Sequence, residues 1–121
     1  MIIGIDMPAG GGTAGAERDR EVADYVERLV ARNHRVGMAE LRAVGRPTAR
    51  VARARHLAMY LQRVLLQLSC EEIGRRYGQH RTSVSHACRK VEELRDRKFF
   101  DRRVQRLEDR IGMVLHPGRL H

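Results

Sequence analysis

The sequence predicts an all-α protein built as one domain. Apolar residues recur at intervals of three and four along most of the chain, which is the spacing of one buried stripe on a helix. No segment alternates apolar and polar residues over the length of a strand. Glycine, proline and capping residues divide the chain into helix-sized segments. A chain of 121 residues is long enough for one core and too short for two ordinary domains.

The N-terminal segment, residues 1–16, is rich in glycine and predicts a flexible tail. Its glycine run at 10–15 has neither a preceding strand nor a following Lys-Ser/Thr pair, so a linker is favoured over a phosphate-binding loop. The domain is expected to span residues 17–115. Its first helix is expected over 17–32, where the apolar residues on one face are Val22, Val26, Leu29 and Val30.

Two helices are expected in the middle of the chain. Gly37 and Gly45 bracket a short one over 38–44, and Thr48 after Pro47 starts a longer one that ends near residue 67. The inner face of the longer helix is expected to carry Leu57, Leu61, Val64, Leu65 and Leu68. The side chains expected to project elsewhere are Arg55, His56, Met59, Gln62 and Arg63.

The next two helices form a helix-turn-helix pattern. Ser69 and Glu72 make a capping box, in which each side chain accepts a hydrogen bond from the other residue's backbone N–H. A short helix over 70–77 is expected to end at Gly78 in the left-handed conformation. A second helix is expected to begin at Arg81, with an inward stripe of Val84, Ala87, Cys88, Val91 and Leu94. Two helices joined by about three residues around a glycine are typical of this motif.

An extra C-terminal helix follows. Polar residues 96–98 interrupt the apolar pattern, which predicts either a new helix or a sharp bend. The stripe then restarts at Phe100, Val104, Leu107, Ile111 and Val114. Packing onto the domain's own core is favoured, and a seam between two copies in a homodimer is the alternative. Residues 116–121 are expected to form a tail.

The charge favours a polyanionic partner. The formal net charge is +9, and only Lys90 and Lys98 are lysines. Nucleic acid is the leading partner for so basic a domain, ahead of an acidic membrane surface or an acidic protein. Arginine suits bidentate contacts with phosphate and guanine, although a GC-rich genome produces the same bias. The 4% aromatic content disfavours stacking on single strands.

The sequence offers no support for an enzyme, a cofactor, a metal site or a membrane span. Cys70 and Cys88 have no neighbouring ligands at metal spacing, and His34, His80 and His86 have no paired acid or cysteine. There is no run of 18 apolar residues and no leader pattern, so a cytoplasmic, nucleoid-associated protein is expected.

The polar side of the second motif helix is expected to read duplex DNA. With Val84 facing inward, steps of 100° per residue define the opposite face. That face carries Thr82, His86 and Arg89, flanked by Ser83, Ser85 and Lys90. A merely solvated face is the ordinary alternative, but the capped partner helix, the glycine turn and the net charge together favour DNA.

Each of these side chains has an expected role. Short side chains at the helix start let it enter the major groove, where Thr82 and Ser83 touch base edges or a thymine methyl. Arg81 is expected to pair with guanine, and Arg89 and Lys90 to hold phosphates alongside.

Three stretches also resemble a known family. They are residues 54–61 (Ala-Arg-His-Leu-Ala-Met-Tyr-Leu), 69–74, and 82–91 (Thr-Ser-Val-Ser-His-Ala-Cys-Arg-Lys-Val). Together they resemble the C-terminal DNA-binding domain of the bacterial replication initiator DnaA. The likeness extends weakly upstream to residues 36–46 and covers about residues 22–95.

The resemblance implies a Trp-repressor-like helix-turn-helix that binds a short duplex site, the DnaA box. By position, Arg55 and Arg63 correspond to phosphate-contacting residues of the long helix. Thr82 and Ser83 stand where the family has a Thr-Thr pair that contacts bases and phosphate. Either Arg46 or Arg50 corresponds to the arginine that enters the minor groove.

The sequence departs from this pattern in the turn. His80 stands where the family usually has an acid, Arg81 where it has histidine, and Glu71 where it has proline. DNA binding is therefore expected, while preference for the usual box is open. The lost acid also removes a good N-cap, at a cost of about 1 kcal/mol unless Thr82 caps instead.

The expected function is sequence-specific binding of double-stranded DNA, as a regulator of transcription or replication initiation. The sequence lacks the phosphate-loop motif of the initiator's ATPase, so a free-standing DNA reader is expected. The alternative is a protein-interaction module that docks through residues 100–114.

Overall fold

The computed structural model describes residues 12–43 and 45–119, and the regular elements in those ranges are all helical. In chain order they are α2 (Gly12–His34), α3 (Met38–Arg42), α4 (Ala49–Leu65), α5 (Cys70–Tyr77), α6 (Arg81–Leu94), α7 (Lys98–Leu115) and the short 3₁₀ helix η2 (Pro117–Arg119). The all-α prediction is confirmed. None of the described helices combines the length and the apolar character that crossing a membrane requires.

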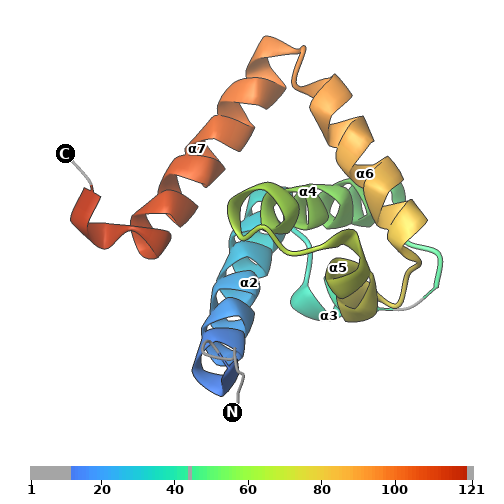
Figure 1. Ribbon diagram of the computed structural model, residues 1–121. Coiled ribbons are helices and arrows are strands. Elements are labelled where there is room, and N and C mark those ends of the chain that lie inside the picture. Colours follow the sequence, from blue (N-terminus) through green and yellow to red (C-terminus); the bar gives the residue numbers. More distant parts are fainter. Residues whose placement is uncertain (1–11, 44, 120–121) are drawn as a thin grey trace.

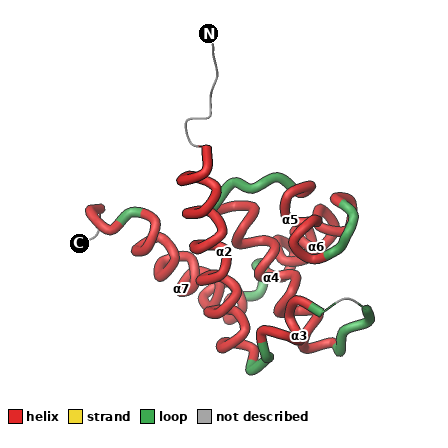
Figure 2. The backbone as a smooth tube through the Cα atoms, turned by 90° about the horizontal axis from the view of Figure 1, so that it is seen from below, coloured by secondary structure: helices red, strands yellow, loops and turns green. Residues whose placement is uncertain are grey.

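Helix α4 lies at the centre of the molecule (Figure 1), in contact with α2, α3, α5, α6 and α7. Seen from below, α2 and α7 lie on one side of it and α5 and α6 on the other (Figure 2). Because neighbours surround α4, its buried residues are not confined to one stripe. Met59 and Gln62, which were expected to project elsewhere, are fully buried, whereas Val64 of the expected inner face is 40% exposed. The prediction of a single inner face was therefore wrong.

Helix α2 runs further than its apolar stripe indicated. It begins at Gly12 rather than Glu17, so part of the segment expected as a flexible tail is helical. Residues 1–11 of that segment lie outside the described residues. The predicted stripe faces the core, with Val22, Val26 and Val30 buried and Leu29 packed against them.

A sharp corner separates α6 from α7 (Figure 1), at the position where the apolar pattern changes phase. Arg95 joins the two helices there: its Nε donates to Asp101 at 2.6 Å, and its Nη1 donates to Glu108 at 2.9 Å. The same Nη1 donates to the Tyr60 hydroxyl of α4 at 3.2 Å. The corner is thus held by charged hydrogen bonds on the inner side of the bend.

Helix α7 packs onto the domain's own core, as favoured from the sequence. Its buried residues are Val104, Leu107 and Ile111, and they contact the cluster formed by the other helices. Phe100 is half-buried against the same cluster. Val114, at the end of the predicted stripe, is 40% exposed. Residues 117–119, expected as part of a tail, form η2.

One buried acid ties four helices together. Glu27 of α2 is 1% exposed and accepts hydrogen bonds from Arg42 of α3, from Arg76 of α5 at 3.0 Å and from the Tyr77 hydroxyl. Gln62 of α4 donates to the same hydroxyl at 2.9 Å. Burial, followed by the negative charge of Glu27, raises the pKa of Tyr77 far above its ordinary value. Tyr77 therefore stays protonated and keeps its donor role.

Candidate nucleic-acid interface

The turn between α5 and α6 begins from a firmly capped helix. The Glu72 N–H donates to the Ser69 hydroxyl at 3.0 Å, and the Ser69 N–H donates to the Glu72 carboxylate at 2.8 Å. The second of these bonds holds the pKa of Glu72 below its ordinary value. At the other end, Gly78 adopts the left-handed conformation with φ +64°. The predicted capping box and glycine stop are both confirmed.

Gly74 allows the turn to fold back tightly onto α5. The Gln79 N–H donates to the Gly74 carbonyl oxygen at 2.9 Å. A Cβ at position 74 would lie 2.3 Å from the Gln79 carbonyl oxygen, which is far inside van der Waals contact. Because the clash is with backbone, no side-chain rotation relieves it. The angle and distance between α5 and α6 therefore depend on a residue without a side chain at this position.

The N-cap of α6 is an imidazole. The His80 Nδ1 accepts a hydrogen bond from the Thr82 N–H at 3.1 Å and lies 3.0 Å from the Thr82 hydroxyl oxygen. The sequence predicts either an uncapped helix or a cap from Thr82. His80 instead occupies the cap position, and its unprotonated nitrogen provides the acceptor that a carboxylate would otherwise supply.

Helix α6 divides into the two faces expected from its sequence. Val84, Ala87 and Val91 are buried, and Cys88 is half-buried against the core. Burial raises the pKa of the Cys88 thiol to about 11, so it behaves as a small core residue. The outward side chains are all exposed: Arg81, Thr82, Ser83, Ser85, His86, Arg89 and Lys90. The predicted reading residues thus share one accessible surface.

A second group of candidate arginines lies before and along α4. Arg46 is exposed in the loop that leads to α4, after Gly45 with its φ of +113°. Thr48 caps α4 by accepting from the Val51 N–H at 3.3 Å. Arg50 is exposed in the first turn of α4. Arg63 is exposed near the end of α4 and donates to the Leu68 carbonyl oxygen at 3.4 Å.

Arg55 does not project outward as expected from its place in the sequence. It is 4% exposed, and its guanidinium donates to the carbonyl oxygens of Leu41, Glu40 and Ala43 at 2.9–3.0 Å. These bonds satisfy the carbonyl groups at the end of α3 and fix the start of the loop that carries Arg46. Spacing alone did not indicate this, because the carbonyl oxygens at a helix end that need donors have no signature in the side-chain sequence.

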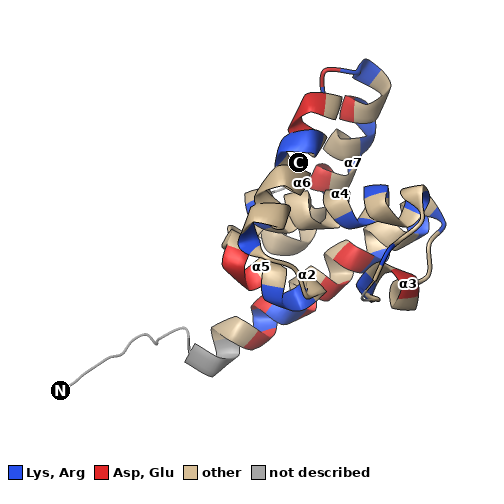
Figure 3. Cartoon of the chain, turned by 90° about the vertical axis from the view of Figure 1, so that its right-hand side faces the viewer, with Lys and Arg blue, Asp and Glu red and all other residues tan. Residues whose placement is uncertain are grey.

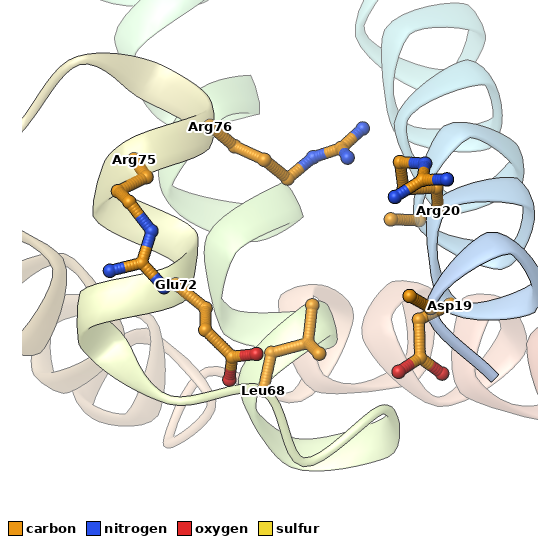
Figure 4. A pocket seen from close by; sticks show the side chains of 8 residues that line it. Asp19, Arg20, Leu68, Glu72, Arg75 and Arg76 are labelled. Carbon is orange, nitrogen blue, oxygen red and sulfur yellow. The ribbon is translucent and has the colours of Figure 1, made fainter. Parts of the chain in front are cut away.

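A hollow lined by both acidic and basic residues lies between α2 and α5. Its volume is about 290 Å³, and Arg75, Arg76 and Glu72 of α5 face Asp19 and Arg20 of α2 across it. Figure 4 shows Arg76 reaching from α5 toward α2, where its Nη2 donates to Asp24 at 2.7 Å. The basic groups here have acidic neighbours within the protein, which sets this hollow apart from the exposed arginines of α6.

The capped α5, the tight glycine turn and the exposed polar side of α6 define a DNA-binding domain of the helix-turn-helix class. Within that class, residues 23–91 match the family described as "Bacterial dnaA protein helix-turn-helix", and the chain belongs to that family.

Curated relatives are named chromosomal replication initiator protein DnaA. The relative from Psychromonas ingrahamii is 42% identical over 73 residues, which is 60% of this chain and 16% of the relative. The relative from Bradyrhizobium sp. strain ORS 278 is 46% identical over 79 residues, which is 64% of this chain and 16% of the relative. The relative from Bartonella quintana is 40% identical over 91 residues, which is 74% of this chain and 18% of the relative. The chain therefore spans less than a fifth of the length of these relatives.

Proposed function

We propose that this chain binds double-stranded DNA in a sequence-dependent way, with α6 in the major groove, and that it acts in the control of replication initiation or transcription. The observation that carries the proposal is the exposed start of α6. There Thr82 and Ser83 are short enough for close approach to base edges, and Arg81 beside them has the reach to pair with guanine. The relatives' name, replication initiator, supports the link to replication.

The remaining candidates have supporting roles in this proposal. Arg89 and Lys90 follow His86 on the exposed side of α6 and are suited to phosphates at the groove edge. Arg63 is suited to a phosphate contact from α4. The minor-groove arginine is Arg46 or Arg50, both exposed next to the Gly45 turn.

Arg55 has a different role in the proposal. Because its guanidinium is buried and donates hydrogen bonds to three backbone carbonyl oxygens, it acts as a positioning residue for the loop and not as a phosphate ligand. His56, its neighbour, is half-buried, and its pKa is lowered by burial and then by the charges of Lys90 and Arg55. This positive potential between α4 and α6 supports an anionic partner on that side.

The direct test is selection of bound sequences from a random duplex pool, followed by salt titration of the selected site. We expect a recurring short motif and a log–log slope of about −4 to −7, for roughly 5–8 phosphate contacts. No enrichment of any sequence, together with a flat salt response, would contradict the proposal and favour the interaction module.

Three substitutions distinguish base-specific contacts from phosphate contacts. Arg81→Ala and Thr82→Ala should each weaken the selected site by about 1–3 kcal/mol while leaving random duplex nearly unchanged. Arg63→Ala should weaken both duplexes alike, because a phosphate contact is independent of sequence. Arg110→Ala, which removes an exposed arginine from α7, is the control and should change neither. Equal losses on both duplexes for Arg81→Ala and Thr82→Ala would show that α6 does not read bases.

A further inference from the structure

A second basic surface lies at the opposite end of α6 from Thr82. Where α6 turns into α7, a cavity of about 400 Å³ opens between four helices. Its lining residues are Asn33, His34, Arg35, Arg50, Arg53, Leu94, Arg97, Phe100 and Arg103. Five of these are arginines, and no acidic residue is among the described residues that line it. We call this the arginine cavity.

The arginine cavity differs from the other charged regions because the hydrogen-bond acceptors of its arginines Arg50 and Arg103 are uncharged. Arg103 Nη2 donates to the amide oxygen of Asn33 at 2.6 Å, and Arg50 Nη1 donates to the backbone carbonyl oxygen of Arg35 at 3.4 Å. Along α2, by contrast, acidic and basic residues alternate (Figure 3), and the hollow shown in Figure 4 has acids facing its arginines. The positive charge of the arginine cavity is therefore uncompensated within its own lining.

Two further observations indicate a preformed anion site. Arg35, at φ +56°, forms the left-handed turn that ends α2, where the Val36 N–H donates to the Ala31 carbonyl oxygen at 2.9 Å, and this hydrogen-bonded turn places Arg35 in the lining of the cavity. The N-cap of α7, Arg97, makes no side-chain cap bond, so the positive end of an 18-residue helix adds to the field there. In agreement, the pKa of His34 is lowered by burial and then by the charge of Arg103.

We propose that the arginine cavity binds the phosphodiester backbone of the duplex that flanks the site read by α6, with Arg53, Arg97 and Arg103 as phosphate ligands. This inference rests on the proposed function. Arg50 makes the cavity continuous with the loop that carries Arg46, and Arg53 lies one turn further along the same face of α4. The 14 residues of α6 place the cavity about 20 Å from its tip, or about six phosphates along one strand.

The test compares two duplexes with the same pool-selected site, one of about 12 base pairs and one with about 10 more on each side. Arg97→Ala/Arg103→Ala removes two exposed cavity arginines. Arg102→Ala/Arg110→Ala removes the same charge from α7 outside the cavity and is the control. We expect wild-type protein and control to bind the long duplex roughly tenfold more tightly than the short one, and the cavity variant to lose this advantage.

Two more readouts make the assignment specific. The salt slope on the long duplex should fall by about 1–2 in the cavity variant, corresponding to one or two lost phosphate contacts. Neutral methylphosphonates in the flank should weaken the wild type and leave the cavity variant unchanged. An unchanged preference for the long duplex in the cavity variant, or an equal loss in the control, would overturn the inference. If the wild-type protein selects no site at all, the proposed function is wrong. If it binds the short duplex normally but binds the long duplex no more tightly, only the phosphate-binding role of the arginine cavity is refuted.

Discussion

At the scale of single residues, the N-cap of α6 shows how one ring nitrogen can replace a carboxylate. His80→Ala removes the acceptor for the Thr82 N–H and should lower the free energy of unfolding by about 0.5–1 kcal/mol. His80→Asp should restore or exceed the wild-type value, because aspartate is among the best N-caps. Urea denaturation of the three proteins measures this. Identical midpoints for wild type and His80→Ala would mean that the bond contributes nothing.

Two histidines should make stability depend on pH. The pKa values of His34 and His56 lie below their ordinary 6.5, chiefly because burial penalises the charged ring. Unfolding returns them to ordinary values, so the unfolded chain binds more protons in the window just below 6.5. The free energy of unfolding should therefore fall as the pH is lowered through 6.5, and these two residues should add no further loss below their folded-state values.

Urea denaturation at several values between about pH 5.5 and pH 7.5 tests this dependence. His34→Gln/His56→Gln, which removes both titrating rings, should flatten the curve. If the free energy of unfolding of the wild type rises as the pH is lowered, or if the double variant shows the same slope as the wild type, then His34 and His56 are not the groups responsible.

At the scale of elements, Gly74 sets how closely α5 and the turn approach each other. Gly74→Ala places a Cβ against the Gln79 carbonyl oxygen and should lower the free energy of unfolding by about 2–3 kcal/mol. Gly112→Ala in α7 is the matched control, because a Cβ added there would meet nothing within 4 Å. That change should stabilise the protein by up to about 1 kcal/mol through helix propensity. Thermal or urea unfolding distinguishes the two, and losses of equal size would exclude the steric explanation.

The elements that the sequence predicted well are those whose signals are local. Ser69 with Glu72, Gly78 and the apolar residues that follow Val84 depend on neighbours a few positions away, and the structure confirms them except for Leu94, which is only partly buried and lines the arginine cavity. The exposed reading side of α6 was predictable for the same reason. The imidazole cap of His80 was missed because histidine is not among the preferred N-cap residues.

Other features depend on contacts between distant parts of the chain. Arg55 reaches carbonyl groups 12–15 residues away, and the arginine cavity gathers residues from α2, α4, α6 and α7. Contacts between residues far apart in the sequence leave no periodic pattern from which they could be predicted. The burial of Met59 and Gln62 likewise follows from the number of neighbours around α4, which a single-helix pattern does not contain.

At the scale of the whole molecule, the buried carboxylate of Glu27 connects three helices to α2. Glu27→Gln removes the charge that Arg42 and Arg76 face and should lower the free energy of unfolding by about 2–3 kcal/mol, because two cations then share Asp24 alone among these acids. Glu21→Gln on the exposed side of α2 is the control and should stay within about 0.5 kcal/mol. Chemical denaturation checks both, and a neutral effect of Glu27→Gln would show that desolvation offsets the ion pairs.

The central position of α4 also has a consequence for motion over time. Leu57 and Leu61 are buried in a helix that contacts five others, so we expect their amide hydrogens to reach solvent only when several of these helices detach together. The last turn of α7, with Met113 50% exposed, has fewer such restraints. In deuterated water the centre should therefore exchange only through global unfolding, while the far end of α7 opens and closes many times before that happens.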